Sequence, residues 1–566
     1  MSGLPSGLAK DGPELVFLPL GGCGEIGMNL NVYGVLNGSE RRWLIVDLGI
    51  TFPGDGEPGV DVILPDTEFL ETERENIEAI VLTHAHEDHF GAIPYLWDRL
   101  RVPVYATPFT KALLGLKLEE GGRREPLPIH EVPLSGRIEL GPFDVEFVSM
   151  THSIPEPNAL AIRTGQGLVL HTGDWKLDPE PMVGERANLA RLQEIGSEGV
   201  RALICDSTNV FSGGRAGSEA QVRERLTEIV AGLSGRVAVT GFASNVARMD
   251  TVAAVARATG RQLVMAGRAM HRVKLAAEQA GYLRDFPVLV PDSEAGYLPN
   301  DTVLYFCTGS QGEPRAALAR IASGDHPHIT LGAGDTVIYS SKTIPGNERE
   351  ISHIQNLLTA RGVDIIDEET EGVHVSGHPC RDELTDLYNW VRPALAVPVH
   401  GERRHIAEHV ALAKSCGVEA ALAVANGDLV RLAPGTPMVV DEVPHGRLHV
   451  DGEVIVPAGS TALRERRKLS HSGVIIATLV LGSDGNIAVD PMVLAPGLPN
   501  LRGQSGRTLI EVMEADVENA LLQLGRSRRD DDDAVEEATR RALRGRLKTA
   551  WNKRPVIEVQ IIRLDD

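Results

Sequence analysis

A heptapeptide at residues 83–89, Thr-His-Ala-His-Glu-Asp-His, limits what this chain can fold into more than any other stretch. It follows the apolar run 79–82, which is typical of a buried strand, and precedes residues 90–93, where a helix could begin. Ligand-type side chains two residues apart cannot share one face of a helix, but at the end of a strand they can reach into one cavity. The spacing therefore predicts a metal-binding loop behind a buried strand.

The same loop offers ligands for two ions. His84 and His86 would serve one ion, whereas Asp88 and His89, turned the other way, would serve a second. A histidine-rich surface loop is the plain alternative, but histidine is an uncommon residue and these residues stand at ligand spacing. A two-ion site is the working hypothesis.

Length and composition set the class of protein. A chain of 566 residues exceeds what one hydrophobic core supports, so two to four domains are expected, and 42% hydrophobic residues with 59 Gly and 34 Pro suit a loop-rich α/β protein. Five scattered cysteines without a C-x-x-C pair, and no run near the ~18 apolar residues of a membrane span, predict a cytoplasmic protein without a membrane segment. The formal charge of −22, taken alone, argues against a polyanionic substrate.

Other strand-like runs also end at ligand-type residues, which are Asp47, His152, Asp174 and His400. Functional side chains gather at strand ends because a rigid sheet positions the loops that carry them. Between residues 207 and 372 the pattern changes to alternating helices and strands, which predicts a parallel sheet with covered faces. Ligand-type residues resume at His374, so this block is an insertion that splits the first domain.

These features together resemble the metallo-β-lactamase superfamily. The inserted domain, Asp206 after an apolar run, and the two loops 374–378 and 398–402 resemble its β-CASP branch, which acts on nucleic acids. The three-part layout from about residue 14 to 566 is similar to the bacterial ribonuclease J family. The resemblance implies an α/β fold, namely an αββα sandwich split by an inserted β-CASP parallel α/β domain, followed by a small C-terminal α+β domain.

On this basis we divide the chain into six segments. They are a disordered leader (1–13), the first part of the metallo-β-lactamase domain (14–206), the β-CASP domain (207–372), the second part of the first domain (373–450), a linker (451–466) and a C-terminal αβ domain (467–566).

The resemblance also implies a ligand set. One ion would be held by His84, His86 and His152, the other by Asp88, His89 and His400, with Asp174 as the bridge and Asp88 also counted as catalytic. Asp47 would accept a hydrogen bond from a ligating histidine. Mixed imidazole and carboxylate ligands admit Zn²⁺ or Mn²⁺. The imidazole of His86 stands where di-iron oxygen-reducing members carry a carboxylate, which favours hydrolysis.

Two further residues would assist the chemistry. His378 would act as general acid or stabilise the leaving oxygen, because an imidazole titrates in the useful range, and Asp206 would hold it in orientation. The alternative is a structural histidine and a helix-capping aspartate.

A substrate pocket is expected beside them. The loop of His374, Val375, Ser376, Gly377 and His378 is small and contains glycine, so its backbone N–H groups can approach an anion. The resemblance implies a pocket for a 5′-monophosphate, which would make the enzyme a 5′→3′ exonuclease. Ser244 and Asn245 could add donors at a helix start or simply cap that helix.

Although the chain as a whole is acidic, the segment between residues 251 and 277 is basic and could attract a polyanion locally. It contains no acidic residue and carries Arg257, Arg261, Arg268, Arg272 and Lys274. These residues, Arg268 above all, could line a channel that tracks single-stranded RNA, or could be ordinary surface charges. Phe52 could stack on a base or pack in a core.

The resulting expectation is a metal-dependent ribonuclease of RNA maturation and decay, 5′→3′ exonucleolytic on 5′-monophosphate ends with some endonuclease activity. A β-CASP nuclease that acts on DNA or only internally is one alternative, and a non-catalytic RNA-binding subunit is another. A lactonase or thioesterase is disfavoured by the inserted domain. The apolar alternation of Ile557, Val559 and Ile561 suggests a homodimer through the C-terminal domain, and larger assemblies with RNA-decay proteins would be compatible with it.

Overall fold

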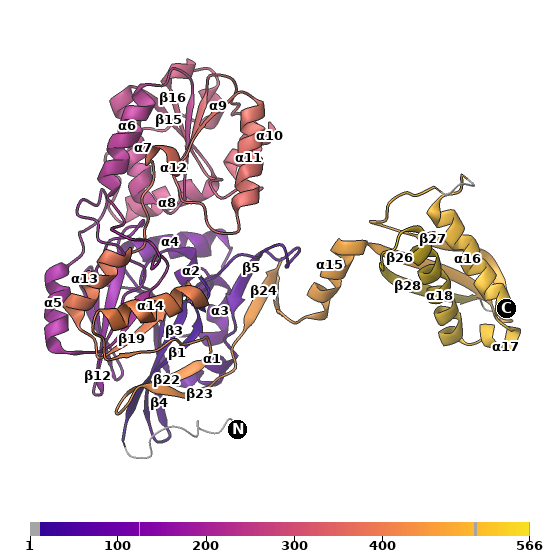
Figure 1. The fold of residues 1–566 in the computed structure, drawn as a ribbon, viewed down its shortest axis with the longest axis horizontal. Helices are drawn as coiled ribbons and strands as arrows, with labels where there is room; N and C mark the ends of the chain where they lie inside the picture. Colours follow the sequence, from indigo (N-terminus) through magenta and orange to yellow (C-terminus); the bar gives the residue numbers. More distant parts are fainter. Residues whose placement is uncertain (1–11, 124, 503–505, 565–566) are drawn as a thin grey trace. The chain divides into compact units, whose positions relative to one another are not determined.

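The structure, a computed structural model, describes residues 12–123, 125–502 and 506–564. Residues 1–11 of the predicted leader therefore lie outside the described residues. The chain forms two compact units (Figure 1). One unit holds residues up to Thr51 together with Leu64–Arg447, and the other holds Phe52–Ile63 together with residues from Leu448 onward.

The larger unit contains a sandwich of two mixed sheets. The first sheet has the order β23-β22-β1-β3-β4-β6-β7-β8. Its strands are β1 (Glu14–Gly21), β3 (Leu30–Asn37), β4 (Glu40–Val46), β6 (Ile77–Val81), β7 (Val104–Ala106), β8 (Ile129–Glu131), β22 (Asp428–Ala433) and β23 (Met438–Glu442). The second sheet has the order β21-β19-β13-β12-β11-β10-β9. Its strands are β9 (Arg137–Leu140), β10 (Phe143–Ser149), β11 (Asn158–Thr164), β12 (Gly167–His171), β13 (Val200–Asp206), β19 (Leu395–Val399) and β21 (Ala420–Ala421).

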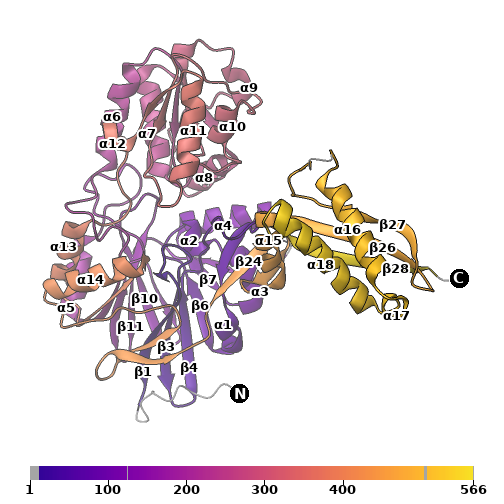
Figure 2. The same cartoon turned by 45° about the vertical axis from the view of Figure 1, so that its right-hand side comes forward.

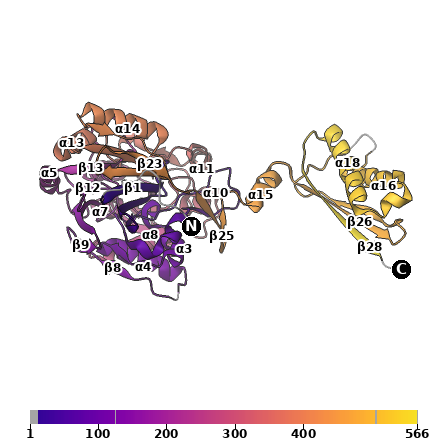
Figure 3. The same cartoon turned by 90° about the horizontal axis from the view of Figure 1, so that it is seen from below.

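The sheets pack face to face through one hydrophobic core, to which Phe17 and Tyr33 contribute from one sheet and Phe143 and Phe147 from the other. Helices cover both outer faces (Figure 3). On one side lie α2 (Glu87–Phe90), α3 (Ile93–Leu100) and α4 (Pro108–Glu120); on the other lie α5 (Leu189–Glu198), α13 (Arg381–Val391) and α14 (Arg403–Ser415). This is an αββα sandwich, which confirms the predicted fold class.

Strands from distant parts of the chain close the sandwich. β22 pairs antiparallel with β1, β19 pairs parallel with β13, and the short β20 (Gly401–Glu402) pairs with β2 (Cys23–Gly24). The first domain is therefore split in sequence, as the distribution of ligand-type residues predicted.

The insertion is a five-stranded parallel sheet with the order β15-β16-β14-β17-β18. The strands are β14 (Val237–Thr240), β15 (Gln262–Ala266), β16 (Val303–Cys307), β17 (Thr336–Tyr339) and β18 (Asp364–Ile366). Helices α6 (Glu219–Ala231) and α7 (Val246–Thr259) lie on one side of it, and α10 (Ala317–Ser323) and α11 (Glu348–Ala360) on the other (Figure 1, Figure 2). The remaining helices are α8 (Arg268–Gln279), α9 (Asp292–Ala295) and α12 (Glu368–Glu371).

The second unit ends in an α+β domain. Its sheet has the order β27-β26-β28, from β26 (Val474–Gly482), β27 (Ile487–Leu494) and β28 (Val556–Leu564). Helices α16 (Leu509–Gln523) and α18 (Asp532–Ala550) cover one face of this sheet (Figure 3). The short α17 (Arg526–Arg529) joins them.

Ile557, Val559 and Ile561 contribute to this domain's own core, and β28 lies at an edge of the sheet, so their part in pairing with another chain stays a prediction. The segment predicted as a linker holds β25 (Val454–Pro457), which pairs with β24 (Arg447–Asp451), and the first part of α15 (Thr461–Ser472). β24 pairs in turn with β5 (Val62–Pro65), next to the loop that begins at Phe52. Phe52 is 66% exposed, so of its two predicted roles packing in a core is wrong. None of the described helices is long and apolar enough to cross a bilayer.

Candidate metal centre and substrate pocket

The heptapeptide lies where the sequence predicted, between the end of β6 and the start of α2. His84 is fully buried, and His86 stands at the N-cap of α2 in an extended conformation. Asp88 and His89 follow within the helix, where the ring of His89 lies 4.0 Å, centroid to centroid, from that of His84. One short segment thereby supplies two groups of donors.

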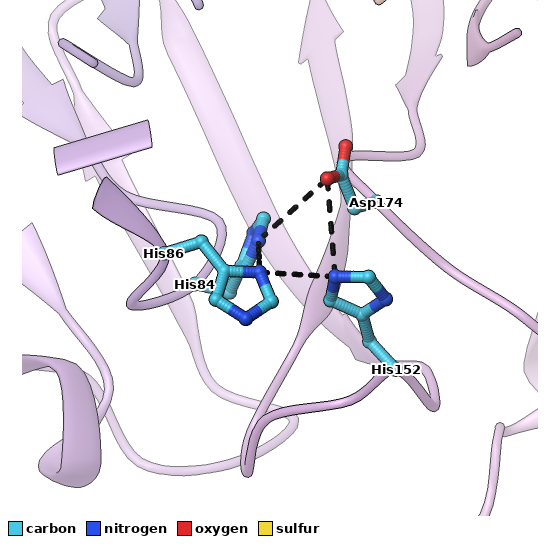
Figure 4. A group of neighbouring side chains, drawn as sticks. All are labelled: His84, His86, His152 and Asp174. Atoms are coloured by element: carbon cyan, nitrogen blue, oxygen red, sulfur yellow. Dashed lines mark hydrogen bonds and ion pairs between the residues drawn. The ribbon is translucent and has the colours of Figure 1, made fainter. Parts of the chain in front are cut away.

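The first group consists of His84, His86, His152 and Asp174 (Figure 4). Each residue offers one potential ligand atom, and these atoms all lie within 4.8 Å of one another. The Nδ1 atom of His86 lies 3.1 Å from Nε2 of His84 and 3.0 Å from Nε2 of His152. Oδ2 of Asp174 lies 3.9 and 3.8 Å from the same two Nε2 atoms.

The second group consists of Asp88, His89, Asp174 and His400. Oδ2 of Asp174 lies 3.2 Å from Nε2 of His89 and 3.5 Å from Nε2 of His400. Oδ2 of Asp88 lies 3.6 and 3.7 Å from these two nitrogens. Asp174 belongs to both groups, and β19 brings His400 from the far end of the split domain to its side.

The donors fit divalent cations. Oδ1 of Asp174 is buried and accepts no hydrogen bond from the described residues. Burial and neighbouring imidazoles hold the pKa of His84 and His152 well below its usual value, and burial lowers the pKa of His86 to about 4. These rings are therefore neutral at pH 7, which is the form that binds a metal.

The protonation state of Asp174 also suits the binding of divalent cations. Burial alone would raise its pKa, but the charges of His400, His89 and His378 hold the pKa well below its usual range. Asp174 is thus a carboxylate that can face two cations at once. Such a mixture of imidazole and carboxylate ligands suits Zn²⁺ and Mn²⁺ alike.

Hydrogen bonds on the outer nitrogen turn the Nε2 lone pair of three rings toward the cluster. Nδ1 of His152 donates to the carbonyl oxygen of Gly377 at 2.5 Å, and Nδ1 of His400 donates to Oδ1 of Asn29 at 2.9 Å. Nδ1 of His89 donates to Oδ2 of Asp47 at 2.7 Å. Asp47 also accepts hydrogen bonds from the backbone N–H and hydroxyl of Thr83, both at 2.8 Å, and belongs to neither donor group.

Asn29 is a site residue that sequence reasoning missed. It is buried, holds His400 through Oδ1, and places Nδ2 3.1 Å from Nε2 of His89. Its residue type is not a common ligand, so the search for ligand-type residues behind strands passed over it. The available signal was a lone amide between two apolar residues after a glycine-rich turn.

His378 and Asp206 lie together beside Asp174. Nδ1 of His378 is 2.8 Å from Oδ2 of Asp206 and 3.9 Å from Oδ2 of Asp174. Thr208 donates to Oδ1 of Asp206 from its backbone N–H and its hydroxyl, which fixes the carboxylate. Burial would lower the pKa of His378, but the charges of the two aspartates outweigh it and raise that pKa to about 9.

The loop 374–378 is held from several sides. Oγ of Ser376 accepts hydrogen bonds from Nδ2 of Asn209 at 2.6 Å and from the backbone N–H of His378 at 3.1 Å. A Cβ atom on Gly377 would stand 2.7 Å from Cε1 of His152, so this close approach requires glycine. Val375 packs against Gly217, and Nδ1 of His374 is buried without a hydrogen-bond partner among the described residues.

The remaining predicted substrate residues lie in the inserted domain. Asn245 is the N-cap of α7, where its Oδ1 accepts from the backbone N–H of Arg248 at 2.8 Å, and Ser244 directly precedes it. Arg268 is exposed at the first residue of α8.

The rest of the basic run is partly engaged in structure. Arg261 is buried and donates to the carbonyl oxygens of Leu233, Gly235 and Val303, so its predicted place in an RNA channel is wrong. Arg272 forms an ion pair with Glu120 of α4.

Domain models of known families match most of the chain. The metallo-beta-lactamase superfamily matches residues 29–202, and the ribonuclease J beta-CASP domain matches residues 234–358. The Zn-dependent metallo-hydrolase RNA specificity domain matches residues 362–423, and the ribonuclease J C-terminal domain matches residues 461–564.

Whole-chain relatives agree with these matches. The chain is 46% identical over 557 residues to a ribonuclease J of Sinorhizobium meliloti, which covers 98% of each chain. It is 38% identical to that of Mycolicibacterium smegmatis (96% of each) and 37% identical to that of Thermus thermophilus (89% of this chain, 90% of the relative).

Among solved structures, a crystal structure of a protein of unknown function from Enterococcus faecalis V583 has a TM-score of 0.51 at 17% identity. It covers 74% of this chain and 100% of that chain, and at this identity it speaks for the fold alone. The domain matches and the identity over nearly the whole length establish that this chain belongs to the ribonuclease J family of metal-dependent ribonucleases.

Proposed function

We propose that this ribonuclease works with two divalent cations held by the two donor groups. His84, His86 and His152 would bind one cation, Asp88, His89 and His400 the other, and Asp174 would bridge them. The observation that carries this proposal is the position of Asp174, whose Oδ2 lies within 3.9 Å of imidazole nitrogens of both groups. Zn²⁺ or Mn²⁺ suits these ligands, and the RNA specificity domain matched here is described as Zn-dependent.

When bound, such cations lower the pKa of a water molecule and neutralise charge on the phosphodiester. His378 would donate a proton to the departing oxygen, and its hydrogen bond to Asp206 would hold the ring in position. Asp47 and Asn29 would orient His89 and His400. Asp88 would both bind its cation and lie next to the reacting phosphate.

The loop of His374, Val375, Ser376, Gly377 and His378 would bind the 5′-terminal phosphate of single-stranded RNA. The backbone of this loop lies against His152 through Gly377, so a phosphate held there is close to the first donor group. A terminal phosphate bound beside the cleavage site would restrict attack to the first linkage, which yields 5′→3′ exonuclease activity with a secondary endonuclease activity. Ser244, Asn245 and Arg268 would contact the following nucleotides.

Matched oligonucleotides test this function. The enzyme should degrade 5′-phosphorylated RNA faster than RNA with a 5′-hydroxyl or triphosphate, and both faster than DNA of the same sequence. Preference for DNA, or release of internal fragments regardless of the end group, would favour the alternative β-CASP nuclease. Such products would contradict the proposed exonuclease.

The Asp174→Ala variant tests the metal centre. Removing the shared carboxylate takes a ligand from both groups, so turnover should be abolished while the far-ultraviolet circular dichroism spectrum is retained. Metal content measured by mass spectrometry should fall in parallel. Undiminished cleavage by a homogeneous preparation would overturn the assignment of the site, and a wild-type protein that bound RNA without cleaving it would be a non-catalytic subunit.

We also propose that the enzyme is a cytoplasmic homodimer that can join RNA-decay assemblies, with domain boundaries as predicted from the sequence. All five cysteines are free thiols, in keeping with a reducing compartment. The support for dimerisation is the sheet face of the C-terminal domain opposite its helices, where Met492, Leu494, Ile562 and Leu564 are 46–64% exposed. Exposed apolar side chains that share one face are typical of a protein interface.

A further inference from the structure

The charges of three basic side chains act on His374 in the loop 374–378. Burial, followed by the charges of Arg248, Lys176 and Lys342, holds the pKa of His374 well below its usual value. The loop therefore lies in a positive electrostatic environment although the chain as a whole carries a formal charge of −22.

Two of these cations are already neutralised. Arg248 is fully buried, forms a 3.1 Å ion pair with Glu219, and donates to the backbone and side chain of Ser340. Lys176 is buried and forms a 3.1 Å ion pair with Asp178. Each pair lies within one domain, the first in the insertion and the second in the sandwich, and neither leaves an uncompensated charge for a ligand.

Lys342 is different. It lies on the exposed segment between β17 and α11, and its Nζ donates to the neutral amide oxygen Oδ1 of Asn209 at 3.4 Å. No carboxylate of the described part of the chain pairs with it. The side chain of Gln311 donates to the backbone carbonyl of Lys342 at 2.9 Å and so fixes the segment.

Asn209 connects this ammonium to the pocket. The amide that accepts from Lys342 also donates through Nδ2 to Oγ of Ser376 and to the carbonyl oxygen of His378. The exposed ammonium of Lys342 is therefore connected to the loop 374–378 through a single side chain, that of Asn209. A terminal phosphate monoester carries roughly −1.5 to −2 charges near pH 7, against one charge for an internal phosphodiester and none for a hydroxyl.

We propose that Lys342 is the specificity-determining residue by which this enzyme distinguishes a 5′-phosphate from a 5′-hydroxyl RNA end, an inference that rests on the proposed binding of the RNA 5′ end at loop 374–378. Its ammonium is a flexible point charge that can turn from Asn209 to a phosphate oxygen. The charges of Arg248 and Lys176 are paired with carboxylates, so only the charge of Lys342 is available to a bound phosphate.

The test compares kcat/KM on one RNA sequence with either a 5′-phosphate or a 5′-hydroxyl, for the wild type, Lys342→Met, Lys342→Arg and Lys414→Met. In Lys342→Met the ratio of the two kcat/KM values should fall roughly tenfold, mainly through KM for the phosphorylated RNA, as expected for one charge-assisted hydrogen bond. Lys342→Arg should restore most of the ratio. Lys414→Met removes an exposed lysine in the last turn of α14 and should leave both values unchanged.

The outcomes separate this inference from the proposed function. A wild type that discriminates between the two ends while Lys342→Met keeps the same ratio would overturn the role of Lys342 alone. An equal loss on both RNAs would also overturn it, because that result identifies a structural contribution through Asn209. A wild type without end-group discrimination would overturn the proposed function and this inference together.

Discussion

At the scale of single residues, the closest constraint in the site is the contact between Gly377 and His152. Gly377→Ala places a methyl group 2.7 Å from Cε1 and 2.8 Å from Nδ1 of the His152 ring. The ring must move, and its hydrogen bond to the carbonyl of residue 377 is disturbed. Because disturbing the support of a metal ligand costs roughly 10–100-fold in metal affinity or activity, we expect a loss of that size in kcat/KM and in metal affinity measured by chelator competition.

Gly115→Ala is the matched control, because a Cβ atom at this helical glycine of α4 meets no atom within 4 Å. This variant should keep full activity and metal affinity. If Gly377→Ala behaved like Gly115→Ala, the tight packing of the loop on His152 would be refuted.

The residues of the proposed metal centre could be predicted from the sequence because each one follows an apolar strand and has a ligand-type side chain. His84, Asp174 and His400 are examples, and the structure brings all three to one place. Asn29 escaped because its function is to hold other residues, which only the three-dimensional arrangement reveals. Arg261 was misread for a related reason: its guanidinium satisfies backbone carbonyls of its own domain, and charge alone cannot tell that use from RNA binding.

At the scale of elements, His409 joins α14 to its neighbours. Its Nε2 atom is 2.9 Å from the hydroxyl of Tyr388 on α13, and its Nδ1 atom is 2.9 Å from Oγ of Ser207, just after β13. The ring is fully buried, and burial lowers its pKa from 6.5 to about 4. In the unfolded chain the imidazole takes up a proton below pH 6.5, whereas the folded protein resists protonation until about pH 4.

Stability must therefore fall as the pH is lowered through this window. Between pH 7 and pH 5 this one group lowers the free energy of unfolding by about 2 kcal/mol. We expect His409→Gln to lose that part of the pH dependence, measured by urea denaturation of both proteins at the two pH values. His353→Gln, at an exposed position of α11, should retain the wild-type dependence, and an unchanged slope in His409→Gln would contradict the assignment.

Helices and strands could be predicted from the sequence where the hydrophobic periodicity is strong. The βα alternation of the insertion was predicted correctly, and the structure shows that α6 begins with a capping box formed by Ser218 and Gln221. The loop 52–63 was not placed, because its contacts are with residues distant in sequence: the backbone N–H of Asp61 donates to the carbonyl oxygen of Val450, and Oδ2 of Asp61 accepts from the backbone N–H of Gly452. Local sequence patterns do not predict contacts between residues so far apart in the chain.

At the scale of the whole molecule, the predicted ligands all belong to one compact unit and the proposed dimer surface belongs to the other. Deleting residues 467–566 should therefore turn the dimer into a monomer while metal binding persists. Light scattering coupled to size-exclusion chromatography would measure the mass, and metal analysis of the same fractions is the control for an intact site. A truncated protein that remained a dimer would place the interface in the remaining chain.

The pairing of β1 with β22 and of β13 with β19 has a consequence for synthesis on the ribosome. A nascent chain builds its amino-terminal strands first, but the strands that complete both sheets, and the imidazole of His400, emerge only after the insertion has been translated. The second donor group stays incomplete until then. A nuclease built in this way cannot complete its proposed metal centre until β19 and β22 have left the exit tunnel, so most of its own translation passes before it can cleave RNA.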